Sequence, residues 1–167
     1  GGFAGGESSR DLRDPEHNLT ILSGDLLGND GPNFTNYGDN SNNVVTATGV
    51  NSSAVMDGFS VIAGNAIGAP DDRGGGLYVG VSGGSPTIRQ CTFDRNSGTY
   101  GGGISKDGPG TMTLTDCQLT NNHSLQDGGG AWAVGEGLVA NRCRFASNSA
   151  DGDGGALFAN GVQILNC

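Results

Sequence analysis

The sequence is poor in basic residues, and this limits its partners. Its 167 residues include 8 lysines and arginines against 17 aspartates and glutamates, which gives a formal net charge of −9. An acidic chain is repelled by phosphate backbones and anionic lipids, so we expect no nucleic-acid partner. The sequence also lacks a run of about 18 apolar residues, and we therefore expect no membrane insertion by this segment.

Hydrophobic residues are scarce as well. They make up 34% of the chain, whereas 33 residues are glycine, which is lean for a compact globule with one central core. The apolar residues nevertheless recur at fixed places. Four cysteines, Cys91, Cys117, Cys143 and Cys167, follow one another at intervals of 26, 26 and 24 residues. This spacing indicates a structural repeat.

Each repeat contains three short strand-like segments. A glycine cluster leads into an apolar strand, as in Gly74–Val79; a second strand has an apolar residue three positions before the cysteine; the third begins at the cysteine, as in Cys91–Phe93. The three-residue step from Ile88 to Cys91 breaks the two-residue alternation of a strand, so a corner must lie between them. We predict an all-β, right-handed parallel β-helix with 24–27 residues and three strands per rung, rising about 4.8 Å per rung.

The predicted coil extends along the whole chain as one domain. Residues 54–167 form its regular rungs, which we expect to be truncated at the C-terminus. Upstream the pattern weakens, and we interpret residues 1–53 as irregular N-terminal rungs. The polar, turn-rich stretch near residues 28–42 is predicted to be a lateral loop.

Asparagine and cysteine recur at positions suited to stacking. Asn96, Asn122 and Asn148 each stand five residues after a cysteine, and amides at one bend of successive coils can bond to one another. The even number of cysteines would also fit disulfides. Neighbours about 4.8 Å apart in parallel register are too far apart for that bridge, so we expect a ladder of buried free thiols. Zinc is disfavoured because no CxxC pair exists.

The glycine and phenylalanine motifs resemble a known family. Gly-Gly-Ala/Gly-Ile/Leu paired with Phe-x-x-Asn is similar to the repeats of the chlamydial polymorphic outer-membrane proteins; the matching segments are Gly74–Leu77 with Phe93–Asn96, Gly101–Ile104 with Leu119–Asn122, and Gly154–Leu157. The chain departs from the pattern in having Leu119 for phenylalanine and no large aliphatic residue in Gly128–Ala131. The resemblance implies a bacterial protein that is secreted or displayed at the cell surface, and it carries no catalytic motif.

Catalytic constellations are hard to find in the repeats. Charged residues expected on the outer face, Asp57, Arg89, Asp94, Arg95, Asp116 and Arg142, alternate in sign from rung to rung, as on a solvated surface. Polysaccharide lyases and hydrolases need carboxylates that converge on one face. We therefore predict no catalytic residues and no required cofactor.

Acidic residues before the glycine clusters suggest a calcium site. Asp71, Asp72, Asp127, Asp151 and Asp153 would lie close together on successive coils, and calcium prefers several such oxygens. The spacing matches neither the EF-hand loop nor the nonapeptide calcium repeat. Because aspartate is also a good turn former, ordinary turns are the alternative.

Two aromatic residues are candidates for ligand binding. If Leu77, Ile104, Ala131 and Ala156 face inward, Tyr78 and Trp132 face outward about 10 Å apart. Exposed aromatic faces suit a sugar ring or a protein partner. The alternative is that a lateral loop covers both rings.

These observations favour a non-catalytic cell-surface scaffold. We expect an adhesin-like segment on the outside of a bacterium, with a glycan or a cell-surface protein as partner. Two alternatives stay open: a carbohydrate-active enzyme whose active site lies outside these residues, and a filament that self-associates end to end through unpaired strand edges.

Overall fold

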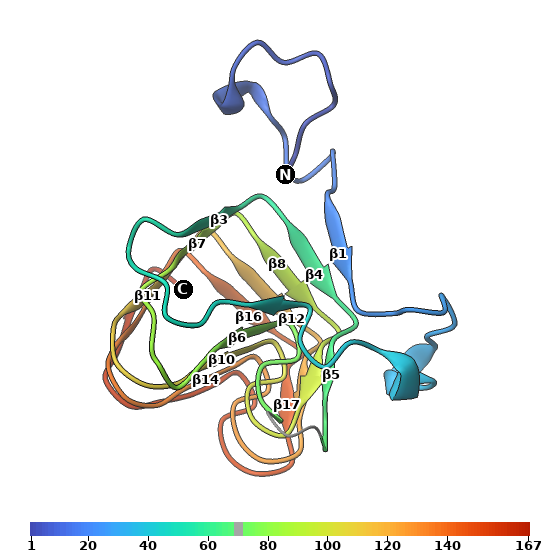
Figure 1. Cartoon of the computed structure of the whole chain (residues 1–167), viewed down its shortest axis with the longest axis vertical. Coiled ribbons are helices and arrows are strands. Elements are labelled where there is room, and N and C mark those ends of the chain that lie inside the picture. Colours follow the sequence, from blue (N-terminus) through green and yellow to red (C-terminus); the bar gives the residue numbers. More distant parts are fainter. Residues whose placement is uncertain (69–71) are drawn as a thin grey trace.

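The structure is a coil of short parallel strands. The computed structural model describes residues 1–68 and 72–167, and its strands join along the coil into stacked parallel sheets, shown obliquely in Figure 1. Each strand pairs with the equivalent strand of the next rung and not with its neighbour in sequence. This arrangement confirms the predicted parallel β-helix.

Every complete rung contributes one strand to each of four sheets, which we name after the strands of the second complete rung. The β6 sheet contains β2 (Val45–Thr46), β6 (Leu77–Val79), β10 (Ile104–Lys106), β14 (Ala131–Ala133) and β18 (Leu157–Ala159). The β7 sheet contains β3 (Val55–Asp57), β7 (Thr87–Arg89), β11 (Met112–Thr115), β15 (Leu138–Asn141) and β19 (Val162–Leu165). The β8 sheet contains β1 (Ile21–Ser23), β4 (Ser60–Ile62), β8 (Thr92–Asp94), β12 (Gln118–Thr120) and β16 (Arg144–Ala146). The β9 sheet contains β5 (Asn65–Ala66), β9 (Ser97–Gly98), β13 (His123–Ser124) and β17 (Ser149–Ala150).

The rung therefore has a fourth strand beyond the three that we predicted. Each strand of the β9 sheet has only two residues, as in Ser97–Gly98. Two residues are too few to leave a visible alternation of apolar and polar side chains, so the sequence pattern concealed this strand.

The register of the β6 sheet corrects one predicted inward residue. Leu77, Ile104, Ala131 and Leu157 are aligned across four rungs. Ala156, which we had placed in this column, precedes it and takes the position of the third glycine of the earlier clusters. A Cβ at the equivalent Gly130 would lie 2.4 Å from the carbonyl oxygen of Ala156, so close packing of the two rungs needs a glycine on one side.

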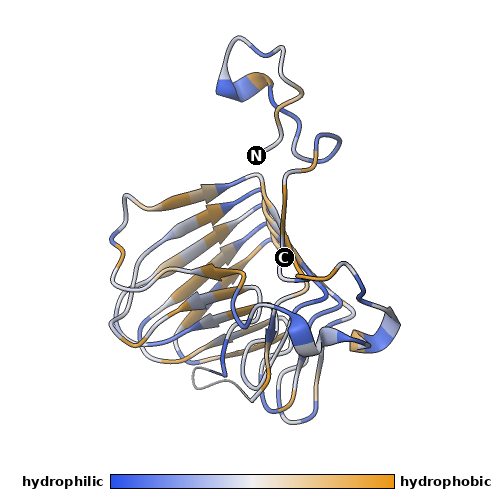
Figure 2. Ribbon diagram, turned by 45° about the vertical axis from the view of Figure 1, so that its right-hand side comes forward, coloured by the Kyte–Doolittle hydropathy of each residue, from blue (hydrophilic) through white to orange (hydrophobic). Residues whose placement is uncertain are grey.

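Apolar side chains fill the inside of the coil in columns. Val61, Phe93 and Leu119 occupy one register position of the β8 sheet, and each is fully buried. Figure 2 shows hydrophobic segments recurring at the same place on successive strands. Burying one such side chain contributes about 1.5–3 kcal/mol, so the column stabilises contacts between rungs.

A left-handed residue makes the corner before each cysteine. Gln90, Asp116 and Arg142 have φ values of 50°, 54° and 52°. The backbone N–H of Gln90 donates to the carbonyl oxygen of Thr115 over 3.0 Å, which ties the corner to the next rung. This turn accounts for the three-residue step between inward side chains.

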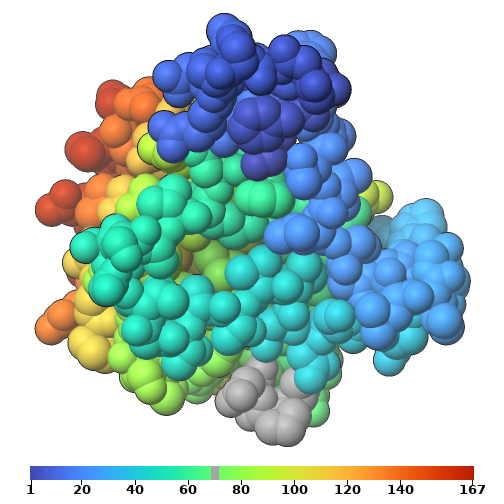
Figure 3. Space-filling model, turned by 45° about the horizontal axis from the view of Figure 1, so that its top comes forward, coloured from blue at the N-terminus to red at the C-terminus, as the bar shows by residue number. Residues whose placement is uncertain are grey.

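Two segments of the first 53 residues lie outside the stack. The N-terminal segment, residues 1–20, contains the 3₁₀ helix η1 (Arg10–Leu12) and extends from one end of the coil, drawn dark blue in Figure 1. The lateral loop, residues 28–42, contains η2 (Pro32–Phe34) and η3 (Tyr37–Asp39) and forms the light-blue lobe in Figure 3. Only β1 and β2 of this region join the sheets.

Candidate functional site

The two aromatic residues predicted to bind a ligand lie in one column of the β6 sheet, with Ser105 between them. The structure corrects their expected exposure, because Tyr78 is 8% and Trp132 7% exposed. Arg73 lies with its guanidinium carbon 5.1 Å from the centre of the Trp132 ring and donates to Asp107 over 2.6 Å. Strand alternation points both rings outward, but the guanidinium of Arg73 lies over the ring of Trp132.

Two of the acidic residues before the glycine clusters accept hydrogen bonds from the next rung. Oδ1 of Asp127 accepts a hydrogen bond from the backbone N–H of Asp153 over 2.8 Å, and the carbonyl oxygen of Asp72 accepts from Thr99 over 2.8 Å. Among the described residues, no group of three or more Asp, Glu, His or Cys could hold a metal ion. Asp71 lies outside the described residues. Calcium binding by this set, including Asp151, stays a prediction.

Three asparagine amides form a ladder inside the coil. Nδ2 of Asn96 donates to Oδ1 of Asn122 over 3.1 Å, and Nδ2 of Asn122 donates to Oδ1 of Asn148 over 3.0 Å. Nδ2 of Asn122 also donates to the carbonyl oxygen of Phe93 in the preceding rung. These bonds satisfy polar groups that would otherwise be buried without partners.

All four cysteines are free thiols in the structure. Cys91, Cys117 and Cys143 are buried in the apolar core, whereas Cys167 is exposed. Burial raises the pKa of the Cys91 thiol. The hydrogen bond between Cys117 and Cys143 raises the pKa of Cys117 and lowers that of Cys143. The buried thiols pack as small hydrophobic side chains.

The charged residues on the outer face pair with one another. Asp57 accepts hydrogen bonds from Arg13 and Arg89, the latter over 2.6 Å, and Arg142 binds both carboxylate oxygens of Asp116, at 2.6 and 2.8 Å. Burial would raise the pKa of Asp57, but the two arginines outweigh it, and the pKa lies below its ordinary value. Asp94 accepts from Arg95 over 2.9 Å. The pairs of Asp57 and Asp116 tie the N-terminal segment and the rungs together, whereas Asp94 and Arg95 are neighbours in sequence.

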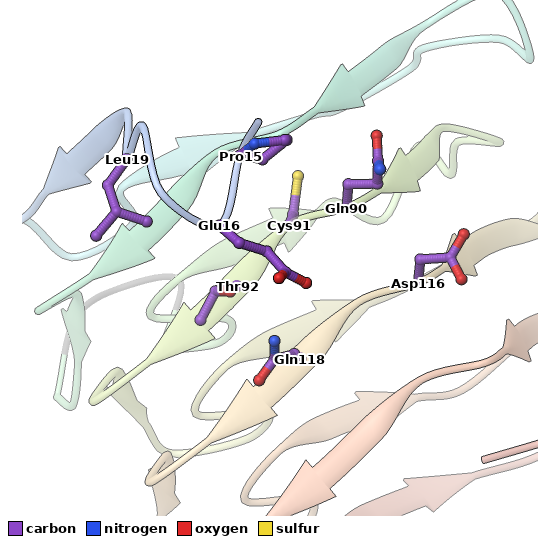
Figure 4. Close-up of a pocket in the computed structure, with 8 residues that line it drawn as sticks. All are labelled: Pro15, Glu16, Leu19, Gln90, Cys91, Thr92, Asp116 and Gln118. Carbon is purple, nitrogen blue, oxygen red and sulfur yellow. The ribbon is translucent and has the colours of Figure 1, made fainter. Parts of the chain in front are cut away.

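A hollow of about 420 Å³ lies where the N-terminal segment overhangs the β8 sheet. Figure 4 shows Glu16 extending from this segment toward the sheet that carries Thr92 and Gln118. Pro15 and Leu19 supply apolar walls, and Asp116 lies at one side. Carboxylate, amide and hydroxyl groups around a partly apolar cleft suit a ligand rich in hydroxyl groups.

Two further hollows lie beneath the lateral loop and share Tyr37 and Arg95. One, of about 510 Å³, is also lined by Asp25, Asp30 and Ile62; the other, of about 360 Å³, is lined by Phe34, Asn121 and Ser149 among others. The hydroxyl of Tyr37 donates to the carbonyl oxygen of Arg95 over 3.0 Å. Burial raises the pKa of Tyr37 to about 12, so the phenol keeps the proton that it donates. All three hollows border the β8 sheet, which we take as the candidate binding face.

The sequence did not reveal these hollows because non-repeating segments form one wall of each. Glu16 and Phe34 belong to no recurring pattern, and nothing in the repeats shows where their segments fold back. The other wall, formed by the β8 sheet, could be recognised from the sequence. Thr92 and Gln118 directly follow inward cysteines, so strand alternation places them on the outer face.

The similarity to known proteins lies in one rung of the coil. In that rung Phe145 is aligned with Leu119, the Asn148 amide accepts from Asn122, and Gly154 turns the chain into β18 with a φ of 67°. Residues 142–160 match the model of the Chlamydia polymorphic membrane protein repeat. No curated protein and no solved structure matched the chain.

The match agrees with the resemblance that the motifs suggested and implies a segment of a bacterial surface or outer-membrane protein. The matched residues run from the left-handed corner at Arg142 through β16, β17 and β18, which is most of one turn of the coil. In the described part of the chain, no helix is long and apolar enough to span a membrane.

Proposed function

We propose that the chain is a rigid, non-catalytic, adhesin-like segment of a bacterial surface protein, and that its β8 face holds a glycan or a protein partner. The observation that carries this proposal is the stack itself. Parallel sheets and the Asn96–Asn122–Asn148 ladder hydrogen-bond each rung to the next. A stack bonded along its whole length behaves as a stiff rod with a broad side surface, which suits display and adhesion.

The arrangement of charges supports a non-catalytic role. Two arginines hold Asp57 and one holds Asp116, and the hydrogen bond from Arg142 lowers the pKa of Asp116. A carboxylate held ionised by an arginine is a poor general acid near neutral pH. These groups therefore serve the stack better than they would serve proton transfer.

A binding assay paired with a hydrolysis assay tests the proposal. The purified chain is applied to a glycan array with and without millimolar calcium, and the same polysaccharides are incubated with the chain to measure released reducing ends. We expect binding without release. Release above that of a heat-denatured sample would overturn the non-catalytic role and favour a carbohydrate-active enzyme. Binding that needs calcium would support the predicted ion site.

Sedimentation velocity of the same sample tests the filament alternative. A scaffold that binds through its side face stays monomeric as its concentration rises. A sedimentation coefficient that grows continuously with concentration would favour end-to-end association instead.

A further inference from the structure

The lateral loop contains a strained aromatic residue. Asn33, Phe34 and Asn36 have φ values of 54°, 59° and 67°. Asparagine tolerates this left-handed region, but a bulky side chain such as phenylalanine adopts it only when its surroundings hold it there. Such strain concentrates at binding and catalytic sites, so the position of the Phe34 ring calls for a functional explanation.

Two rings contact Phe34, one from the lateral loop and one from the coil. The Phe34 ring lies edge-on to Tyr37, with ring centres 5.1 Å apart, and its centre is 5.7 Å from that of His123. Tyr37 is in turn hydrogen-bonded to the backbone of Arg95, and Nδ1 of His123 lies 3.0 Å from Oγ of Ser149. The strained loop is thus fixed across rungs, with the phenylalanine forming one wall of a hollow.

That hollow, of about 360 Å³, combines an aromatic wall with polar groups. The side chains that matter for recognition are Asn33, Phe34, Arg95, Asn121, Ser147 and Ser149. An aromatic face packs against the C–H groups of a sugar ring, while amides and hydroxyls bond to its hydroxyl groups. The volume lies near the lower end of ligand pockets and suits a single ring.

The charge of the lining indicates which class of sugar the hollow suits. Arg95 is the one charged residue of this lining, although the whole chain carries a net charge of −9. Its side chain is 62% exposed and donates to Asp94 through Nε. The described residues give its Nη groups no partner, and a guanidinium with free N–H groups binds a carboxylate well.

We infer that this hollow binds a sugar that carries a carboxylate, with the ring on Phe34 and the carboxylate on Arg95. The inference rests on the proposed function, since it places one of the proposed glycan contacts and names its class. It places the glycan contact at the lateral loop and not at Tyr78 and Trp132, the predicted ligand-binding residues, which are buried.

Matched ligands and variants test it. The full chain is titrated with two sets of ligands. One set is oligosaccharides that contain uronic acid, and the other is the same oligosaccharides after their carboxyl groups have been reduced to alcohols. We expect the acidic forms to bind more tightly. Phe34→Asn keeps a residue that accepts positive φ but removes the ring, and should weaken binding at least about tenfold. Phe34→Tyr keeps the ring and should retain binding.

Arg95→Asn separates recognition from loop anchoring. The arginine φ is 51°, a value that asparagine tolerates, and the Tyr37 hydroxyl bonds to the backbone at this position. We expect the variant to fold and to lose the preference for acidic over reduced ligands. Phe3→Ala, at a 51% exposed residue, and Arg10→Asn, whose side chain is 61% exposed, are the matched controls. Neither should change the affinity.

The outcomes distinguish this inference from the proposed function. If the chain binds none of the acidic oligosaccharides, the inference fails while the rigid surface scaffold stands. If it binds them and both Phe34→Asn and Arg95→Asn behave like the controls, the binding site lies elsewhere. Release of reducing ends would overturn the non-catalytic role. The affinities of the Phe34 and Arg95 variants would still show whether the acidic sugar binds in this hollow.

Discussion

The side-chain amide of Asn96 donates to Oδ1 of Asn122 over 3.1 Å, and both residues are fully buried. The same Oδ1 accepts the backbone N–H of Asn96 over 3.0 Å. Each asparagine therefore substitutes for a missing backbone partner at a corner where the strands change direction. Buried polar groups satisfied in this way hold one register of stacking and disfavour others.

Removing the middle amide of the ladder should weaken the stack. Asn122→Ala leaves the buried Asn96 backbone N–H without an acceptor and breaks both side-chain bonds of the ladder, and we expect the free energy of unfolding to fall by about 3 kcal/mol. Urea denaturation measures the change. The neighbouring Asn121→Gly, at an exposed residue with a φ of 54°, should cost less than about 1 kcal/mol. Equal losses would show that the ladder adds nothing.

The glycine cluster sets how closely the rungs approach. A Cβ on Gly102 would lie 2.2 Å from the carbonyl oxygen of His123 and 2.8 Å from that of Gly129. Gly102→Ala should therefore lower the free energy of unfolding by about 3 kcal/mol, the upper end of the cost of overpacking. A Cβ on Gly38 would meet no heavy atom within 4 Å, so Gly38→Ala is the control. Comparable melting temperatures for the two variants would contradict close packing.

Lys106, the single lysine of the chain, is fully buried between Val79 and Ala133. Its Nζ donates to the carbonyl oxygen of Gly108 over 2.5 Å. Burial lowers its pKa, although Glu136 and Asp107 act in the opposite direction. Lys106→Met should raise the free energy of unfolding at pH 7 by about 1 kcal/mol, because a well-packed apolar residue needs no buried charge.

The pH dependence gives the control for this substitution. A lysine whose folded pKa is lowered destabilises the protein fully below that pKa, and the penalty disappears as the pH approaches the ordinary value of 10.5. The advantage of Lys106→Met should shrink between these limits. A pH-independent advantage would mean that packing, and not charge, causes it.

The N-terminal segment should detach in acid. The pKa of Asp57 is held below its ordinary value of 3.8, so its contribution is complete above about pH 4 and is lost as the pH falls through the lowered pKa. Asp57→Asn should cost about 2–3 kcal/mol at pH 7 and flatten the fall in melting temperature below pH 4. Asp151→Asn, at an exposed corner, should leave that fall unchanged. An identical fall in all three proteins would assign the acid sensitivity to other groups.

The repeating half of the fold was readable from the sequence, because period and alternation act locally. The spacing of the cysteines predicted the regular rungs, and the register agrees, since Leu119 is aligned with Phe93 and with Phe145, each two residues after a cysteine. Ala156 was misplaced by one residue because an alanine stands there at the third glycine position. Counting from the first glycine of the cluster gives the correct Leu157.

The candidate site was much less predictable. Strand alternation correctly sends the side chain of Trp132 outward, but it does not tell that Arg73, from a distant turn, covers the ring. The lateral loop is fixed by a few single contacts, such as the hydroxyl of Tyr37 on the Arg95 backbone. A single hydrogen bond between residues far apart in the chain produces no repeating pattern in the sequence. The walls formed by Glu16 and Phe34 could therefore not be predicted from it.

The left-handed corners have a consequence for how such a protein can change over generations. Their backbone is bonded to the next rung, while the side chains of Gln90, Asp116 and Arg142 are neutral, acidic and basic at the same corner. Replacing one of them leaves the interior columns intact, and only Asp116 and Arg142, which pair with each other, must change together. Selection can therefore rewrite the outer edge of the coil by one residue or one pair at a time, while the columns that hold the interior stay the same.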